Sequence, residues 1–195
     1  GAAASVTIDG SAGGVVADAA GNTVTLTTGS TLNGADADAN AEVVGAAIVL
    51  LAVDGSIGVT NVLDVDATAS LDADTSTANG NILLDDVAGV MPLGHINAGT
   101  GDVTLNAEGG AVTDVNGDPA VNVTATNAIL TAAGAIGGGG GADDVETAVT
   151  DLSGSTSAPG DVVIDEANGI TVSAFTTNDG AFTLSAGDAA TLTSI

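Results

Sequence analysis

Short runs in which apolar and polar residues alternate recur along the whole chain, and Gly, Asn and Asp separate them. Val, Ile, Leu and Thr fill these runs, as they fill half-buried β-strands. The Asn-Gly and Asp-Gly dipeptides between the runs allow sharp turns, because these residues tolerate positive φ. The pattern therefore predicts strands at 5–8, 23–28, 47–53, 81–85, 102–106, 128–132, 161–165 and 181–186. A helix, if the chain has one, is expected in the alanine-rich stretch 41–53.

The runs are themselves repeated at a spacing of about 80 residues, and self-similarity at a fixed period is the sequence signature of a repeat architecture. Leu51–Gly58 (LAVDGSIG) matches Leu130–Gly137 (LTAAGAIG) at Leu, Gly, Ile and Gly. The segment 80–85 matches 160–165 in the same way. We interpret residues 1–195 as one continuous domain with an internal repeat, about 41–120 and 121–195.

Strand and turn units that recur every 20–25 positions or so are typical of a solenoid. In a parallel β-coil each turn stacks about 4.8 Å above the last, so small aliphatic residues suit the interior and Gly, Asn and Asp suit the corners. The prediction is an all-β fold, a right-handed parallel β-solenoid (β-helix) with about 20–25 residues per coil. The alternative is a pair of tandem immunoglobulin-like β-sandwiches. The solenoid is favoured because sandwich cores usually contain large aromatic residues, and this chain has two Phe and no Trp or Tyr.

Composition narrows the set of partners. The chain has no Lys or Arg and 25 acidic residues, so its formal net charge is −25. Nucleic acids and anionic membrane surfaces are both bound through basic side chains, so neither is an expected partner. Cysteine is also absent, which excludes disulfides, thiol nucleophiles and thiolate metal sites. The remaining partners are cations and other copies of the chain.

The region Leu130–Gly187 resembles the repeats of giant filamentous-haemagglutinin-like surface proteins of Gram-negative bacteria. The resemblance rests on the order of four segments, which are a glycine-rich corner (137–141), ETAVTDL (146–152), GDVVIDEANGI (160–170) and TNDGAFTLSAG (177–187). It implies a right-handed β-helix in a secreted adhesin or fibre, located outside the cell or on its surface. The resemblance assigns no activity to individual residues of this chain.

A cation site is predicted at Asp114, Asn116 and Asp118, which alternate like the oxygen ligands that open a calcium loop. A complete loop of the EF-hand type has a bidentate Glu at its twelfth position, and Ala125 stands there. The alternative is a structural turn. The segment 138–146 (GGGGADDVE) fits the pattern of calcium β-rolls once, with Asp143 as a ligand, although such sites need tandem copies.

Three pairs of carboxylates two residues apart are interpreted as solvated surface, although paired carboxylates also act in glycoside cleavage. The pairs are Asp36/Asp38, Asp64/Asp66 and Asp72/Asp74. His95 is solitary and is expected to be a packing or surface residue.

These observations predict a structural, non-enzymatic segment of an extracellular fibre or giant adhesin. It would either assemble end to end with copies of itself or continue into a longer chain. The alternative is an extracellular module whose folding depends on Ca²⁺.

Overall fold

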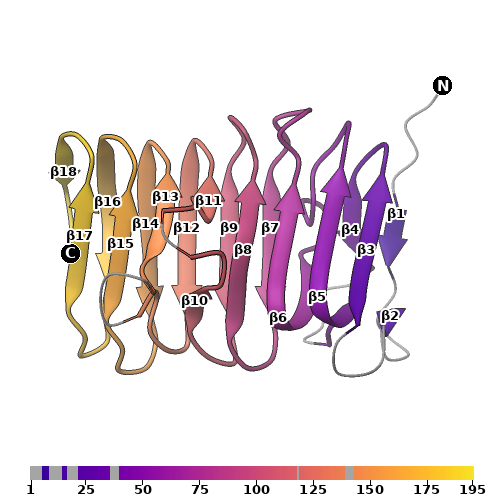
Figure 1. Cartoon of the computed structure of the whole chain (residues 1–195), viewed down its shortest axis with the longest axis horizontal. Helices are drawn as coiled ribbons and strands as arrows, with labels where there is room; N and C mark the ends of the chain where they lie inside the picture. Colours follow the sequence, from indigo (N-terminus) through magenta and orange to yellow (C-terminus); the bar gives the residue numbers. More distant parts are fainter. Residues whose placement is uncertain (1–5, 9–14, 17–21, 36–39, 118, 139–142) are drawn as a thin grey trace.

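The computed structural model describes residues 6–8, 15–16, 22–35, 40–117, 119–138 and 143–195. In these residues every regular element is a β-strand, and stacked parallel coils form one elongated body with strands β1 and β18 at opposite ends (Figure 1). The predicted β-solenoid is therefore confirmed, and the tandem sandwiches are wrong because neighbouring strands pair in parallel. The stretch 41–53 forms strand β5 and not a helix.

Each coil has two faces, and the strands of the two faces run in opposite directions (Figure 1). The first face contains β1 (Val6–Ile8), β4 (Leu32–Gly34), β7 (Ile82–Asp86), β9 (Val103–Ala107), β12 (Asn127–Ala132), β14 (Asp151–Thr156), β16 (Ile170–Thr176) and β18 (Ala190–Leu192). The second face contains β3 (Thr23–Thr28), β8 (Met91–Asn97), β10 (Val112–Asp114), β11 (Val123–Thr124), β13 (Val145–Ala148), β15 (Val162–Glu166) and β17 (Phe182–Ala186).

Two long strands bend from the first face to the second. These are β5 (Val43–Ala52) and β6 (Leu63–Asp74), and each shows a register shift against a neighbouring strand. The short β2 (Val15–Val16) pairs with the first residues of β5.

The register between strands sets the length of a coil. Coils are longer near the N-terminus, where Val6 pairs with Leu32, than near the C-terminus, where Ile170 pairs with Ala190. Both spacings are close to the coil length expected from the sequence. In this register, side chains of the same type stack on one another, as Leu84, Leu105 and Leu130 do in adjacent strands.

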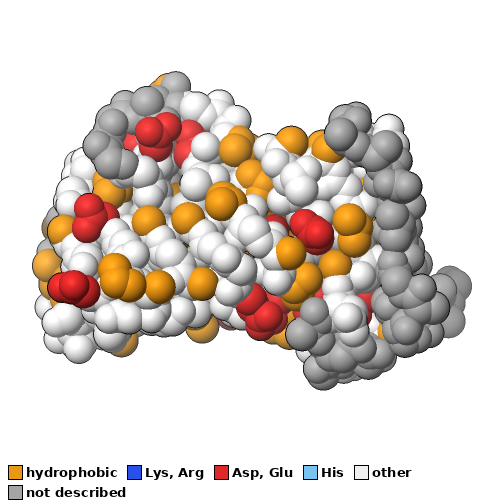
Figure 2. All heavy atoms as spheres, turned by 90° about the horizontal axis from the view of Figure 1, so that it is seen from below, with side chains coloured by type: hydrophobic (Ala, Val, Ile, Leu, Met, Phe, Trp, Pro, Cys, Tyr) orange, Lys and Arg blue, Asp and Glu red, His pale blue; other side chains and the backbone are white. Residues whose placement is uncertain are grey.

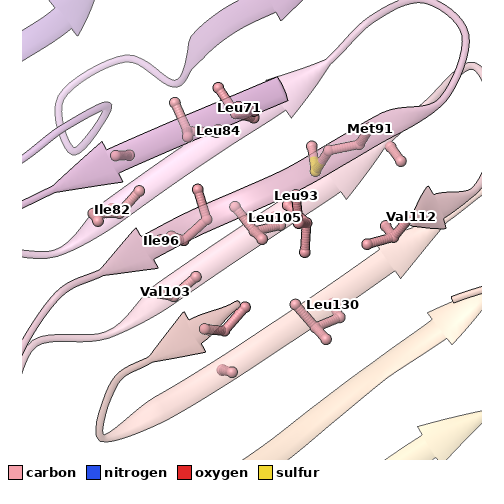
Figure 3. Close-up of a cluster of buried hydrophobic side chains, with 14 of the residues drawn as sticks. Leu71, Ile82, Leu84, Met91, Leu93, Ile96, Val103, Leu105, Val112 and Leu130 are labelled. Carbon is pink, nitrogen blue, oxygen red and sulfur yellow. The ribbon is translucent and has the colours of Figure 1, made fainter. Parts of the chain in front are cut away.

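The core lies between the two faces and consists of aliphatic side chains that point inward from both (Figure 3). Leu93 of β8 and Leu105 of β9 are fully buried there, and Phe175 is the largest side chain in the core. Alternation along a strand sends every second residue inward, which is why β9 buries Val103, Leu105 and Ala107. Small residues suffice because the interior is narrow.

Residues that match in the sequence repeat of about 80 residues lie on opposite faces of the solenoid. Leu51 belongs to the second face and its match, Leu130, belongs to the first. Ile57 and Ile136 are matched in the same way. Each forms isolated β-bridges to the neighbouring coils, and the next strand of the chain begins at Leu63 (β6) or Val145 (β13). The two halves of a coil are thus variants of one strand and turn unit.

Candidate functional site

Two successive coils leave the second face at the same place. β10 and β11 both pair with β8, and the described residues between them, 115–117 and 119–122, belong to an excursion from the coil. In the next coil Ile136 pairs with Val112 and Val162, and the chain returns to the face at β13. Asp114 and Asn116 of the predicted cation motif, and the described residues 138 and 143–146 of the glycine-rich segment, therefore lie at neighbouring excursions. Asp118 and residues 139–142 are outside the described residues.

The carboxylate of Asp114 organises the first excursion. It accepts hydrogen bonds from the backbone N–H of Asn116 (2.8 Å) and of Gly117 (3.0 Å to Oδ2), which is a turn of the Asx type. Gly117 has a φ of 75°, a value that favours glycine. The Asp114 oxygens are thus engaged in this turn, and the Oδ1 of Asn116 accepts from the Asn122 amide.

Asn122 anchors the end of the same excursion, and sequence reasoning did not assign it to the site. Its side chain is fully buried. The amide donates to Oδ1 of Asp114 (2.8 Å) and of Asn116 (3.0 Å), and its own Oδ1 accepts from the backbone N–H of Glu146 (2.8 Å). The one sequence signal there, an Asn-Val-Thr pattern, occurs too often by chance to be informative.

A shallow hollow lies beside this excursion. Its lining includes Pro119 and Val121 of the excursion, Glu146 of β13 and Asp165 of β15. The Glu146 side chain is 5% exposed. Within the described part of the chain no three acidic, His or Cys side chains form a group that could hold a metal ion. The cation site at Asp114, Asn116 and Asp118 thus stays a prediction.

The described residues on either side of the second excursion contact each other. The backbone N–H of Gly138 donates to the carbonyl of Asp143, and the Asp143 side chain is exposed.

The other acidic candidates are distributed over the coils, and Figure 2 shows acidic side chains in separate groups on one face. Asp72 and Asp74 are half-buried, and Asp36 and Asp38 lie outside the described residues. The expectation of a solvated carboxylate is wrong for Asp64, which is 5% exposed. Glu42 of the preceding coil lies against it, since the Asp64 N–H donates to Glu42 Oε2 (2.7 Å) and the Asp64 carbonyl accepts from the Glu42 N–H (2.8 Å).

His95 is exposed, as predicted, on a bulge of β8. Leu93 pairs with Leu71 and Ile96 pairs with Ala73, so two residues of β8 lie opposite Asp72 alone. The Asp72 carboxylate accepts the backbone N–H of His95 (2.9 Å). This contact holds the bulge in place.

Backbone N–H groups are the main donors to the acidic side chains of this protein. At several strand ends an acidic oxygen accepts the N–H two residues further on: Asp74 accepts from Ser76 (2.8 Å) and Glu166 accepts from Asn168 (3.0 Å). Such turns satisfy carboxylates without a basic side chain. They explain how a chain without Lys or Arg can bury acids.

Comparison of this chain with protein-family models, with curated proteins and with solved structures gives no match. No helix long and apolar enough to cross a membrane occurs among the described residues.

Proposed function

We propose that this chain is a structural, non-enzymatic segment of an extracellular bacterial fibre or giant adhesin. In this role its coils stack end to end on another copy or on further coils of a longer chain. The sequence resemblance at 130–187 supports the extracellular setting. The shape of the molecule and its C-terminal rung support the stacking.

The C-terminal rung, residues 181–195, is the observation that carries the proposal. β17 and β18 pair on one side with β15 and β16, and on the other side no described strand pairs with them. Phe182 and Leu184 are only partly buried there, and Leu192 and Ile195 are 56% and 58% exposed. An open strand edge with apolar side chains is a template for another strand.

The distribution of charge favours association at the end of the rod over association along its sides. Within the C-terminal rung, Asp188 is the one acidic residue. The coils behind it carry the other acidic residues, without any basic side chain. Like charges repel along the sides, so association at the rung brings together the fewest carboxylates.

Assembly of the full chain tests this proposal. In buffer with about 1 M NaCl, where the Debye length is about 3 Å, we expect rods in electron micrographs that lengthen with protein concentration. Leu192→Asp places a charge in the rung and is expected to shorten the rods and lower the sedimentation coefficient. Ile129→Asp is the matched control, because Ile129 is 43% exposed on the side of β12. Equal assembly of both variants, or a globular monomer throughout, would contradict the proposal.

The extracellular setting has a separate test. An antibody raised against the chain is expected to label intact cells of its source. Labelling that requires permeabilised cells would contradict this part of the proposal and leave the stacking unaffected.

A Ca²⁺-dependent module is the second candidate. The observation that favours it is the hollow in which Glu146 and Asp165 lie beside the excursion of Asp114 and Asn116. Its ligands would be Asp114, Asn116 and Asp118. The function would then depend on folding in the presence of the cation.

Thermal unfolding separates salt screening from calcium binding. With a net charge of −25, the melting temperature is expected to rise from low to high NaCl because screening weakens repulsion. Under the second candidate, millimolar CaCl₂ at matched ionic strength raises it further, and Asp114→Asn removes that further rise. A sodium effect with no added calcium effect would reject the second candidate. A melting temperature independent of salt would show that repulsion between the carboxylates is negligible.

A further inference from the structure

One acidic side chain lies in the wall of the core itself. Asp86 is the last residue of β7, and its neighbours in register are Val65 of β6 and Ala107 of β9, both fully buried. Asp86 is 1% exposed. Its Oδ1 accepts the N–H of Ala88 (3.2 Å), while its Oδ2 is buried and has no hydrogen-bond partner among the described residues. The carboxylate is therefore only half satisfied.

The titratable groups around Asp86 carry the same sign of charge. Asp64 and Asp66 lie on β6, Asp85 precedes it on β7, and Glu108 follows β9. Like charges disfavour the ionised form of a buried acid. No basic side chain of this sequence can compensate, because the chain has no Lys or Arg.

The single His does not supply the missing charge to Asp86. His95 lies on β8, which forms the other face of the same coil, and its side chain is exposed to solvent. The backbone N–H of His95 donates to the Asp72 carboxylate, and the imidazole Nδ1 lies 3.5 Å from the carbonyl oxygen of Val121.

Burial raises the pKa of Asp86 to about 7, and the charge of Asp66 adds to this effect. The hydrogen bond from the backbone N–H of Ala88 opposes this effect, as does the nearby backbone N–H of Ala67, which does not reach Oδ2 in hydrogen-bond geometry. Burial also raises the pKa of the neighbouring Asp85, against a hydrogen bond from Asn106 and with a contribution from Glu108.

A second acid at the matching position of the repeat is fully satisfied. Asp165–Glu166 corresponds to Asp85–Asp86 in the internal repeat, and both Asp86 and Glu166 accept the N–H two residues on. Glu166 Oε2 additionally accepts the hydroxyl of Thr147 (2.8 Å) and the N–H of Val149 (3.1 Å). The coil can thus bury a carboxylate with several donors. At Asp86 the second oxygen lacks them.

We propose that Asp86 is a proton-operated switch, in which protonation of its half-satisfied buried carboxylate strengthens the coils around β7 as the medium turns from neutral to acidic. The proton removes the charge that cannot be solvated and leaves Oδ1 free to keep the bond from Ala88. The inference does not depend on the extracellular role proposed above.

The direction of the pH dependence follows from linkage. The pKa of Asp86 is about 7 in the folded chain and 3.8 as the ordinary value, so the folded chain binds the extra proton between these limits. Stability from this group is full below about pH 4 and is lost as the pH rises through about 7. The difference between the two pKa values sets a limit of about a thousandfold in the folding equilibrium. Because backbone donors and water relaxation moderate the penalty, we expect about tenfold to a hundredfold.

Denaturant unfolding from pH 4.5 to 8 at constant ionic strength tests the switch. The wild-type equilibrium constant is expected to fall by about tenfold to a hundredfold between pH 4.5 and about 7, and to level off above neutrality. Asp86→Asn, which is neutral at every pH, should flatten this dependence and be more stable than wild type at pH 8. Asp54→Asn is the control for removal of one charge, because Asp54 is exposed, and it should keep the wild-type pH dependence.

Two further measurements complete the test. The ¹³C resonance of the Asp86 carboxyl carbon in the folded wild type should titrate near neutrality, and this readout does not depend on any variant. Titration near pH 4, or the same pH dependence in all three proteins, would overturn the proposal. If millimolar Ca²⁺ or Mg²⁺ at pH 8 gave the full stabilisation seen at pH 4.5 and Asp86→Asn abolished it, a cation would be the ligand and the proton switch would be wrong.

Discussion

Gly58→Ala is expected to destabilise the solenoid by more than about 3 kcal/mol, through two effects at one position. Gly58 has a φ of 72°, and a non-glycine residue in such a conformation costs about 1–3 kcal/mol. A Cβ at Gly58 would also collide with the carbonyl oxygen of Leu83 in the next coil. Backbone cannot yield as a flexible side chain can, so the two coils would have to separate.

Substitutions at two other glycines separate the backbone cost from the effect of the Cβ collision. Gly89 has a φ of 78° and open space around its Cβ position, so Gly89→Ala should show only the backbone cost. Gly29 has open space and no positive φ, so Gly29→Ala should be neutral or stabilising by up to about 1 kcal/mol. Thermal and denaturant unfolding of the three variants gives the series. Equal losses at Gly58 and Gly89 would show that the close approach of the coils contributes nothing.

The same close approach explains why the sequence repeat is visible. Gly137 is the match of Gly58, has a φ of 74°, and its Cβ would collide with the carbonyl oxygen of Val163, the match of Leu83. Glycine is required at both positions by backbone geometry. Such positions are readable from sequence because few residues can replace glycine there.

Several strands with regular alternation were predictable, whereas the alternating β6 and the irregular β8 were not predicted. The stretch 102–106 shows strict alternation and forms β9 at Val103–Ala107. β8 contains Pro92, Gly94 and His95, which are unusual in strand interiors, and no strand is predicted there from the sequence. It forms a strand because neighbouring coils pair with it on both sides and because Asp72 holds its bulge. Those contacts join residues that are distant in the sequence.

The positions of the acids were the least predictable part of the candidate site. Asp64 and Asp66 belong to one alternating stretch, yet Asp64 is buried beneath Glu42 and Asp66 is half-buried. Burial at a corner depends on which segment of the next coil covers it, and alternation does not encode this. Asn122 was missed for the same reason, because its importance comes from Asp114 and Glu146 on other segments.

Leu105→Ala tests whether the small aliphatic core holds the stack together. Leu105 is fully buried between Leu84 and Leu130 in register, and removing a buried Leu side chain costs about 2–5 kcal/mol through lost burial and the cavity left behind. For a chain of this size each kcal/mol lowers the melting temperature by about 2–4 °C, so a drop of about 5–15 °C is expected. Thr104→Ala, on the outward side of the same strand, should cost no more than about 0.5 kcal/mol. Calorimetry of the two variants checks this, and similar losses for both would mean that burial between the two faces is not the main source of stability. A coil contacts only its neighbours, so the lost protection from hydrogen exchange should concentrate in β7, β9 and β12 and leave β16 unchanged.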